Sequence, residues 1–487
     1  MNNSPLNSSI HVIDDDSLLN VFYLYRPFLL GEEDDNEDDR VFGGKGRWDR
    51  GRWWYKLAHV CNRWRNVVLG SAAYLGVSLV CANGTPVADM LEHSHSLPLV
   101  IDYSRNDEIT AEDEEGAILA LKQYDRVRRV RLRMPPTSLQ KLIVAMDDEY
   151  PILEHLIVFQ VALGADSSKD QCAVLVLPES LQAPHMRHLV LVGFALPIGS
   201  RLLTSSVGLV TLSLIMIHPS TYFRPNTLLK WLSSMPQLET LVISLLYPVP
   251  NRDIERQLTR IPITLPITTP IILPNLHSFT FQGVRSYLEA LVHRITAPRL
   301  EKLQFEFFNQ LTFSIPRLLE FVSTTNLRFK TAKFRFYEEA VYVAVYPHEG
   351  AEIYAFSIIV NCCHLDWQVS SVSQIFNLLG PMFSTVDHLA LEHEVHSRSS
   401  EEHNEADRTE WRKLLNLFTN SKTLHVPKGL VEELSRCLQL DDGELPLEVL
   451  PELQELTYSG SGDTGGAFTS FIDARQNSGR PITLIRS

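Results

Sequence analysis

The sequence predicts a mixed α/β protein in which a small helical N-terminal domain precedes an irregular solenoid with a parallel sheet. Three observations predict this fold. Apolar residues recur every three or four positions in residues 10–25 and 53–69, as they do in amphipathic helices. After residue 120, one short apolar phrase recurs many times, as it does in stacked repeats. The chain of 487 residues is also too long for one ordinary hydrophobic core.

Residues 10–25 are expected to form the first helix, after a disordered N-terminus at residues 1–9. Asp14, Asp15 and Asp16 supply a capping oxygen and negative charge in the first turn, and both favour the start of a helix. The apolar residues that follow keep helical spacing: Leu18, Leu19, Val21, Phe22 and Tyr25.

An acidic run interrupts the helical domain, which spans residues 10–80. From Glu32 to Asp39, seven of eight residues are acidic. Such a run repels itself and buries no apolar surface, so we expect residues 31–46 to be a disordered insertion. A specific acidic docking segment is the alternative, and no other feature of the run supports it.

Residues 53–69 predict a second helix. One stripe at intervals of three or four contains Leu57, Val60, Cys61, Trp64 and Val68, while the charged and amide residues fall elsewhere. This spacing places the cysteine and the tryptophan on the packed side, so we expect Leu57, Cys61 and Trp64 to brace the helices from inside. The segment 71–81 then predicts a short third helix or turn that runs into a strand.

The repeated phrase is an apolar residue, two mostly polar residues, an apolar residue, a variable residue and a last apolar residue. Its copies begin at Val127, Leu153, Met186, Leu209, Leu238, Leu276, Leu300, Val386 and Leu453. Clear copies start roughly 23 to 38 residues apart, which is the range of leucine-rich repeats. Each unit is a strand with a return segment, and it buries its apolar face only by stacking on its neighbours. Residues 95–487 are therefore predicted to be a degenerate leucine-rich-repeat domain.

The segments between the phrases carry further signals. Several returns have a helical pattern, at residues 226–235, 286–295 and 411–418. Thr110 and Asp113 match a capping box, which predicts a helix that leads into the first repeat strand. Residues 327–380 fit the repeat poorly, and residues 332–360 within them favour two or three meandering strands, while the last unit is expected to be a helix followed by a strand.

Composition disfavours several kinds of function. A net charge of −14 argues against a general nucleic-acid binder, because phosphate affinity comes from clustered lysine and arginine. The six cysteines have no C-x-x-C spacing, which predicts neither a disulfide framework nor a zinc finger and is typical of a reducing compartment. No signal-peptide pattern and no stretch of about 18 apolar residues occurs. We therefore expect a protein of the cytoplasm or nucleus with no membrane or nucleic-acid partner.

The turn "SGSGDTGG" carries G-x-G-x-x-G at Gly460, Gly462 and Gly465, as dinucleotide-binding loops do. Those loops also need an acidic residue about 20 positions later, at the end of the next strand. The next predicted strand here, "ITLIR", has none. A flexible loop between a strand and a helix is therefore expected, and nucleotide binding is the alternative.

The segment "HLALEHEVHS" resembles a metal site only in composition. It holds His388, Glu392, His393, Glu394 and His396, with His403 nearby. A zinc protease helix needs H-E-x-x-H, and Ser397 stands where the second histidine is required. A repeat strand followed by an acidic loop is expected. Since no other catalytic pattern occurs, we predict no metal, no cofactor and no enzyme activity.

Two basic segments invite a binding role. In "RVRRVRLR", Arg129, Arg131 and Arg133 alternate with apolar residues, so a strand would place them on one face. A solvated strand face is expected, and a surface that receives an acidic partner is the alternative. The segment "RWDRGRWWYK" mixes arginine with aromatics as single-strand binders do, but it follows the acidic run.

Residues 10–80 together resemble an F-box domain, whose pattern is roughly L-P-x-E/D-x-L-x-x-I-F followed by L-x-x-V-C-R-x-W-R. The matching residues are Ile13, Leu18, Val21 and Phe22, then Leu57, Val60, Cys61, Arg63, Trp64 and Arg65. Followed by degenerate leucine-rich repeats, the chain is similar to fungal, mushroom-type F-box proteins. It departs from the pattern at Asp14, which replaces the proline, and in the long acidic insertion.

The resemblance implies that the helical domain docks on the Skp-type adaptor of a cullin ubiquitin ligase while the repeats hold an unknown target protein. The adaptor contacts implied are Ile13, Leu18, Leu19, Phe22 and Val60. The alternative is a repeat scaffold whose F-box no longer binds the adaptor.

Overall fold

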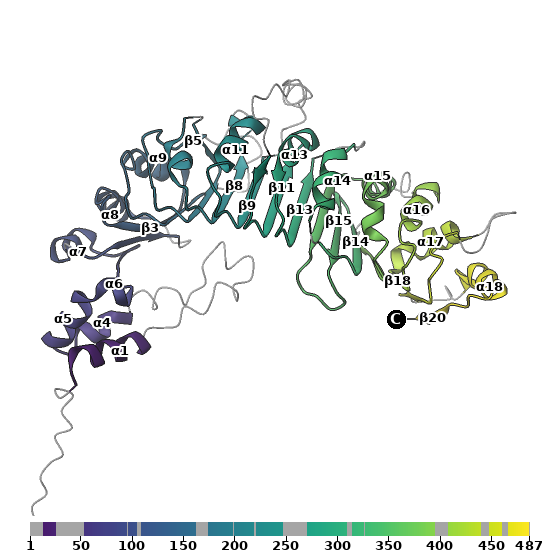
Figure 1. The fold of residues 1–487 in the computed structure, drawn as a ribbon, viewed down its shortest axis with the longest axis horizontal. Helices are drawn as coiled ribbons and strands as arrows, with labels where there is room; N and C mark the ends of the chain where they lie inside the picture. The colour runs from purple at the N-terminus through teal and green to yellow at the C-terminus, as the bar shows by residue number, and fades with distance from the viewer. Residues whose placement is uncertain are drawn as a thin grey trace, which may run out of the picture. The chain divides into compact units, whose positions relative to one another are not determined.

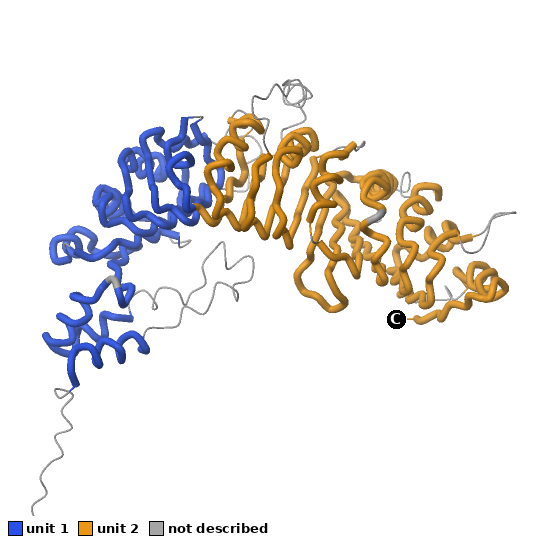
Figure 2. Tube along the Cα trace, in the orientation of Figure 1, with its two compact units in different colours: residues 1–208 blue, residues 209–487 orange. Residues whose placement is uncertain are grey.

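The structure, a computed structural model, divides into two compact units, residues 1–208 (unit 1) and 209–487 (unit 2), which are coloured separately in Figure 2. The residues it describes are 13–25, 53–94, 96–104, 109–161, 174–197, 199–218, 221–246, 270–308, 314–325, 327–394, 408–439, 448–459 and 466–486.

The described part of unit 1 opens with the helices α1 (Asp15–Tyr25), α4 (Trp53–Ala58), α5 (Asn62–Gly70) and α6 (Ala72–Leu75). The predicted single helix over 53–69 is wrong, because the chain turns between α4 and α5. Cys61 has an extended backbone with φ −161° and ψ 169°, and it stands as the N-cap residue of α5. The guanidinium of Arg65 reaches back and donates to the carbonyl oxygen of Ala58 at 3.1 Å, which satisfies the end of α4.

The rest of unit 1 alternates strands with helices. Its main strands lie in the order β1 (Leu79–Cys81), β2 (Leu99–Tyr103), β3 (Val127–Met134), β4 (His155–Gln160) and β6 (His188–Val192), and neighbouring strands are parallel. A small parallel pair is formed by β5 (Leu175–Val176) and β7 (Phe194–Ala195). The returns include α7 (Val87–His93), α8 (Ala111–Leu121), α9 (Pro136–Val144) and α10 (Arg201–Ser205). The predicted capping box of Thr110 and Asp113 is confirmed at the start of α8.

The sheet begins earlier than predicted. We expected the repeat domain to start at residue 95, but β1 already pairs with β2 in parallel, with Leu79 opposite Leu99. The strand expected at the end of segment 71–81 is β1, and all three of its residues are buried.

Unit 2 continues the same alternation over a longer sheet. Its strands lie in the order β8 (Thr211–Ile217), β9 (Thr240–Leu245), β11 (Ser278–Gly283), β13 (Lys302–Phe307), β16 (Phe356–Asn361), β15 (Ala340–Tyr346), β14 (Thr331–Tyr337), β17 (His388–Glu394), β18 (Thr423–Val426), β19 (Glu455–Tyr458) and β20 (Thr483–Arg486). A separate pair is β10 (Ile271–Ile272) with β12 (Ile295–Thr296). The returns include α11 (Pro225–Leu232), α13 (Arg285–Val292), α14 (Pro316–Ser323), α15 (Leu365–Phe383), α16 (Arg408–Leu415), a 3-10 turn at Lys428–Leu430, α17 (Val431–Leu438) and α18 (Thr469–Asn477).

The helices of unit 2 cover one face of its sheet, as Figure 1 shows for α13 to α16. Ring contacts join the sheet to the helices. The ring centroid of Phe279 lies 6.4 Å from that of Phe321 of α14, and the ring centroid of Phe336 lies 5.5 Å from that of Trp411 of α16. The opposite face of the strands carries polar side chains. The predicted helical returns at 226–235, 286–295 and 411–418 are confirmed as α11, α13 and α16, with boundaries shifted by a few residues.

The repeated phrase marks the same local structure, a strand with three buried apolar residues, in both parts of the chain. In all nine copies its three apolar positions are at most 4% exposed. Six copies are preceded by a β-turn in which the residue before a proline accepts a hydrogen bond from the first apolar residue, as Leu273 does from Leu276 at 3.3 Å. Proline fixes φ near the value that the second position of such a turn needs, which explains its place before the strands.

Residues 327–380 interrupt the repeat as expected. Strand β15 is antiparallel to both β14 and β16, while β14 and β16 pair in parallel with β17 and β13. The meander therefore adds a hairpin strand without changing the direction of the strands around it. Phe334 and Val343 face each other across the hairpin, and both are fully buried.

Candidate interaction site

Helix α1 begins at a true capping residue. The carboxylate of Asp14 accepts hydrogen bonds from the backbone N–H and the hydroxyl of Ser17, at 2.8 and 3.0 Å. The backbone hydrogen bond is the largest cause that lowers the pKa of Asp14. Asp14 therefore starts the helix with an N-cap at the position where the F-box pattern has a proline.

The inner side of α1 packs on α5. The rings of Phe22 and Trp64 meet edge-on with centroids 4.8 Å apart, and Leu18 and Phe22 are each only 1% exposed. These two residues were expected to contact the adaptor. Their side chains lie inside the helical domain, so they offer no surface to a partner in this structure, and that part of the expectation is corrected.

The other three predicted contact residues reach solvent. Val60 is 56% exposed in the turn between α4 and α5, Ile13 is 37% exposed, and Leu19 is partly buried. Arg63 of α5 pairs with Asp15 at 2.8 Å and donates to the carbonyl oxygen of Ile13. The start of α1 is thereby held against α5, close to Ile13.

The three predicted packing residues differ among themselves. Leu57 is buried at 8% exposure, while Cys61 and Trp64 are partly buried. The neighbouring tryptophans, Trp53 and Trp54, belong to α4 and are 8% and 5% exposed, and the indole N–H of Trp54 donates to the carbonyl oxygen of Ser78. Buried rings are poor stacking platforms for nucleotides.

The sequence interpretation missed an exposed apolar stripe on α1, made of Val21, Leu24 and Tyr25. Their side chains are 51%, 77% and 54% exposed. A spacing of three and four residues puts them side by side on the helix, next to the side that carries Leu18 and Phe22, and the ring of Tyr25 lies 6.4 Å from that of Trp53 between centroids. The signal was available, because the helix is apolar on more than one side and only one side can pack inside a small domain. We call Val21, Leu24 and Tyr25 the α1 stripe.

The outer strand face of unit 2 carries a connected polar row. The hydroxyl of Ser244 donates to the side-chain oxygen of Gln282, and the amide of Gln282 donates to Glu306 at 2.9 Å. The amide of Asn361 donates to the same Glu306 oxygen at 3.0 Å. Because each side chain is fixed by its neighbour, this row presents a preorganised polar surface.

A second group lies further along the same strand face, at Glu392. Its two carboxylate oxygens meet Lys333 and Arg335 of β14, with Arg335 at 2.6 Å, and Arg335 also lies over the ring of Tyr342 at 5.8 Å. All three charged side chains are about one-third exposed. Of the residues singled out in this segment, His388, Glu392, His393 and Glu394 lie on β17, and Glu392 belongs to this ion-pair network.

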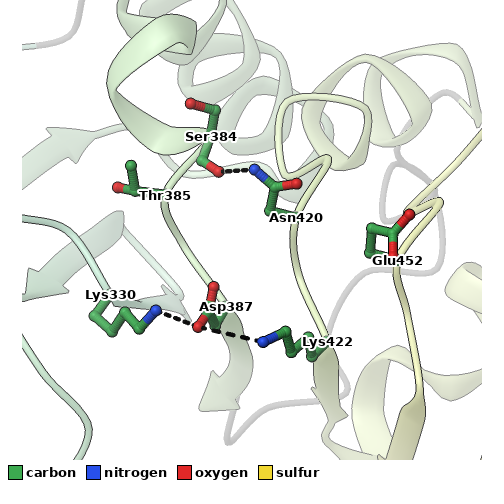
Figure 3. A pocket seen from close by; sticks show the side chains of 7 residues that line it. All are labelled: Lys330, Ser384, Thr385, Asp387, Asn420, Lys422 and Glu452. Carbon is green, nitrogen blue, oxygen red and sulfur yellow. Dashed lines mark hydrogen bonds and ion pairs between the residues drawn. The ribbon is translucent and has the colours of Figure 1, made fainter.

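A shallow pocket of about 470 Å³ opens where β14, β17, β18 and β19 begin, as Figure 3 shows. Asp387 lies between Lys330 and Lys422 and forms an ion pair with Lys330. The amide of Asn420 donates to the carbonyl oxygen of Ser384 beside it. The hydrogen bond from Lys330 lowers the pKa of Asp387. The ion pairs and the hydrogen bond of the pocket connect residues that precede different strands, so they join neighbouring repeats.

The remaining motifs do not assemble into a catalytic centre in the part of the chain that the structure describes. Gly460, Gly462 and Gly465 lie outside the described residues, as do His396, His403 and the acidic run. Burial lowers the pKa of His393, which favours its neutral form. No group of three or more potential metal ligands occurs among the described residues. Among the described helices, none is both long enough and apolar enough to cross a membrane.

Comparisons with known proteins give little beyond the fold seen directly. No family model matches the chain, and no curated protein matches it. Among solved structures, an internalin-like protein of Listeria monocytogenes matches with 15% identity over 53% of this chain and 71% of that one, at a TM-score of 0.21. A superposition at that score carries no argument, so the repeat architecture rests on the register and burial described above.

Proposed function

We propose that the chain is a non-catalytic substrate-recognition subunit of a Skp–cullin–F-box ubiquitin ligase, in the cytoplasm or nucleus. In this proposal the helical domain binds the Skp-type adaptor and the repeats bind a target protein. The resemblance of residues 10–80 to an F-box supplies the ligase assignment. The repeat strands with their outward polar side chains support a protein-binding role for the remainder.

The α1 stripe is the observation that carries the adaptor half of the proposal. Three large apolar side chains on one turn and a half of helix leave apolar area in water, which favours packing on a partner. Val60 adds a fourth exposed apolar side chain in the same small domain. An amphipathic helix that buries such a stripe against another helix is a common mode of recognition.

The mechanism requires no catalytic residue in this chain. A target held on the repeats stays near the ubiquitin-carrying enzyme, so the effective concentration of its lysines rises. Specificity then comes from the side chains on the outer strand face, such as the polar row that contains Gln282 and Glu306. Fixed polar groups reject partners that leave them unpaired.

The test is co-purification of the intact chain with a Skp-type adaptor at micromolar concentration. Leu24→Asp should weaken capture at least tenfold, because it places a charge in the apolar contact. Leu119→Asp on α8 is the matched control, since Leu119 is also a surface leucine at 43% exposure and lies outside the helical domain. Val60→Asp tests the turn in the same way. Absence of a complex with the unchanged chain would refute the ligase assignment.

The alternative is a protein-interaction scaffold whose helical domain does not bind the adaptor. Asp14 favours it, because this residue replaces the proline of the F-box pattern and caps α1 instead. The scaffold predicts that targets captured by the repeats are unchanged when Leu24 becomes aspartate and that no cullin is present among them. Affinity purification followed by mass spectrometry separates the two functions.

A further inference from the structure

The outward side chains of β2, β3, β4 and β6 in unit 1 form a surface with an unusual charge. On β3, Arg129, Arg131 and Arg133 point outward and are partly buried, while Val130 and Leu132 between them are at most 1% exposed and point to the core. This confirms the alternation expected from the sequence. Among the described outward residues of these four strands, Asp102 carries the one carboxylate. We call this surface the arginine face.

On the β4 side, register places apolar side chains beside two of the arginines, and on the β2 side Asp102 lies opposite Arg131. Arg131 lies opposite Ile157, which lies opposite Val190, and Arg133 lies opposite Phe159. The first rung holds Arg129 beside His155 and His188, whose rings stack with centroids 4.5 Å apart. An apolar floor excludes water from one side of a bound charge, and this strengthens its interaction with a guanidinium.

We propose that the arginine face binds an extended acidic segment of a partner protein, with carboxylates at alternate positions paired to Arg129, Arg131 and Arg133. The spacing supports this occupant, because alternate residues lie about 7 Å apart in both the strand and an extended peptide. Guanidinium groups bind carboxylates with two parallel hydrogen bonds. The proposal names the class of target segment, so it rests on the proposed protein-binding function of the repeats.

A protein segment fits this surface better than a nucleic acid does. Single strands bind through exposed aromatic rings on which bases stack. On the arginine face, Phe159 is only 8% exposed, and the rings of His155 and His188 stack on each other. The whole chain also carries a net charge of −14, which repels a long polyanion.

The test measures binding of a fluorescent peptide that alternates three glutamates with valines, using the full chain and anisotropy at low salt. Arg131→Gln should weaken binding at least about tenfold, because one charge-assisted hydrogen-bonded pair is lost. The peptide with glutamine in place of glutamate should show no binding at the same concentrations. Arg201→Gln, which changes an exposed arginine on α10, should leave the affinity unchanged.

Arg133→Gln is the second variant, because it lies nearer the end of β3 and keeps the test valid if Arg131→Gln lowers the melting temperature. Equal affinity in the unchanged chain and both variants overturns the proposal, as does no binding at millimolar peptide. Tighter binding of a twenty-nucleotide single strand through the same arginines also overturns it. The peptide is measured without the adaptor, so failure here and failure of adaptor capture are independent results.

Discussion

Phe22 of α1 and Trp64 of α5 meet edge-on, 4.8 Å apart between ring centroids, at an angle of 63° between the ring planes. Aromatic pairs in this geometry contribute beyond the area they bury. The contact joins two segments that the acidic run separates in sequence. It therefore fixes α1 on the rest of the helical domain and turns the α1 stripe outward.

Phe22→Ala should destabilise the helical domain by about 3–5 kcal/mol, because a large buried ring is replaced by a cavity. Leu24→Ala on the same helix should change stability by less than about 0.5 kcal/mol, since Leu24 is 77% exposed. Thermal or urea unfolding, followed by tryptophan fluorescence, measures both. Equal effects of the two substitutions would show that the inner and outer sides of α1 are assigned wrongly.

The repeat phrase made most of the strand layer predictable from sequence. Its three apolar positions must all be buried, so a pattern of single residues was enough to locate nine strands. Short strands outside the phrase were missed, as in β18 at Thr423–Val426. There, pairing with β17 decides the structure, and pairing is not written in local periodicity.

The candidate adaptor surface was predicted less well than the fold. Periodicity shows that Leu18, Val21, Phe22 and Leu24 are apolar on a helix, but it does not say which side meets α5. That choice is made by Trp64, which lies more than 40 positions away in the sequence and packs on Phe22. The break at Cys61 was hidden for a similar reason, because its extended backbone interrupts an otherwise helical pattern.

Glu289 of α13 caps the next helix of the array. Its two carboxylate oxygens accept hydrogen bonds from the backbone N–H groups of Arg317 and Leu318 at 3.0 and 2.8 Å, at the start of α14. Glu289→Ala should lower stability by about 1 kcal/mol, the usual cost of losing a helix cap. Glu301→Ala, at an exposed glutamate before β13, is the control and should have little effect. Chemical denaturation of both variants gives the comparison.

Asp387 should make the stability of unit 2 depend on pH in the acidic range. Because Lys330 holds the pKa of Asp387 below its usual value, the folded state takes up this proton less readily than the unfolded chain. Its contribution is fully present above the unfolded pKa of about 3.9 and is lost as the pH falls through the lower folded value.

Asp387→Asn should therefore cost about 1 kcal/mol at pH 7, and the difference from the unchanged chain should shrink below about pH 4. Asp473→Asn on α18, at an exposed position, provides the comparison. Urea unfolding at several pH values measures both variants. A difference for Asp387→Asn that stays constant down to pH 2 would contradict the role of the Lys330 pair.

Gln368 fastens α15 to the meander. Its side chain is 1% exposed, and its amide donates to the carbonyl oxygens of Tyr337 and Cys362, both at 2.8 Å. One of these carbonyls ends β14 and the other follows β16, so a single amide joins the two outer strands of the meander. A buried carbonyl oxygen that loses its hydrogen-bond donor lowers the free energy of unfolding, because no water molecule can take the place of that donor.

Gln368→Leu keeps the side-chain size and removes both donors, so unfolding free energy should fall by about 2–4 kcal/mol. Asn377→Leu changes an exposed amide on the same helix and should cost far less. Hydrogen exchange should show faster exchange in β14 and β16 of the Gln368 variant, with α11 and α13 unaffected, because repeat arrays transmit stability mainly to neighbours. Uniform loss of protection across unit 2 would mean instead that the meander and the repeats unfold as one cooperative unit.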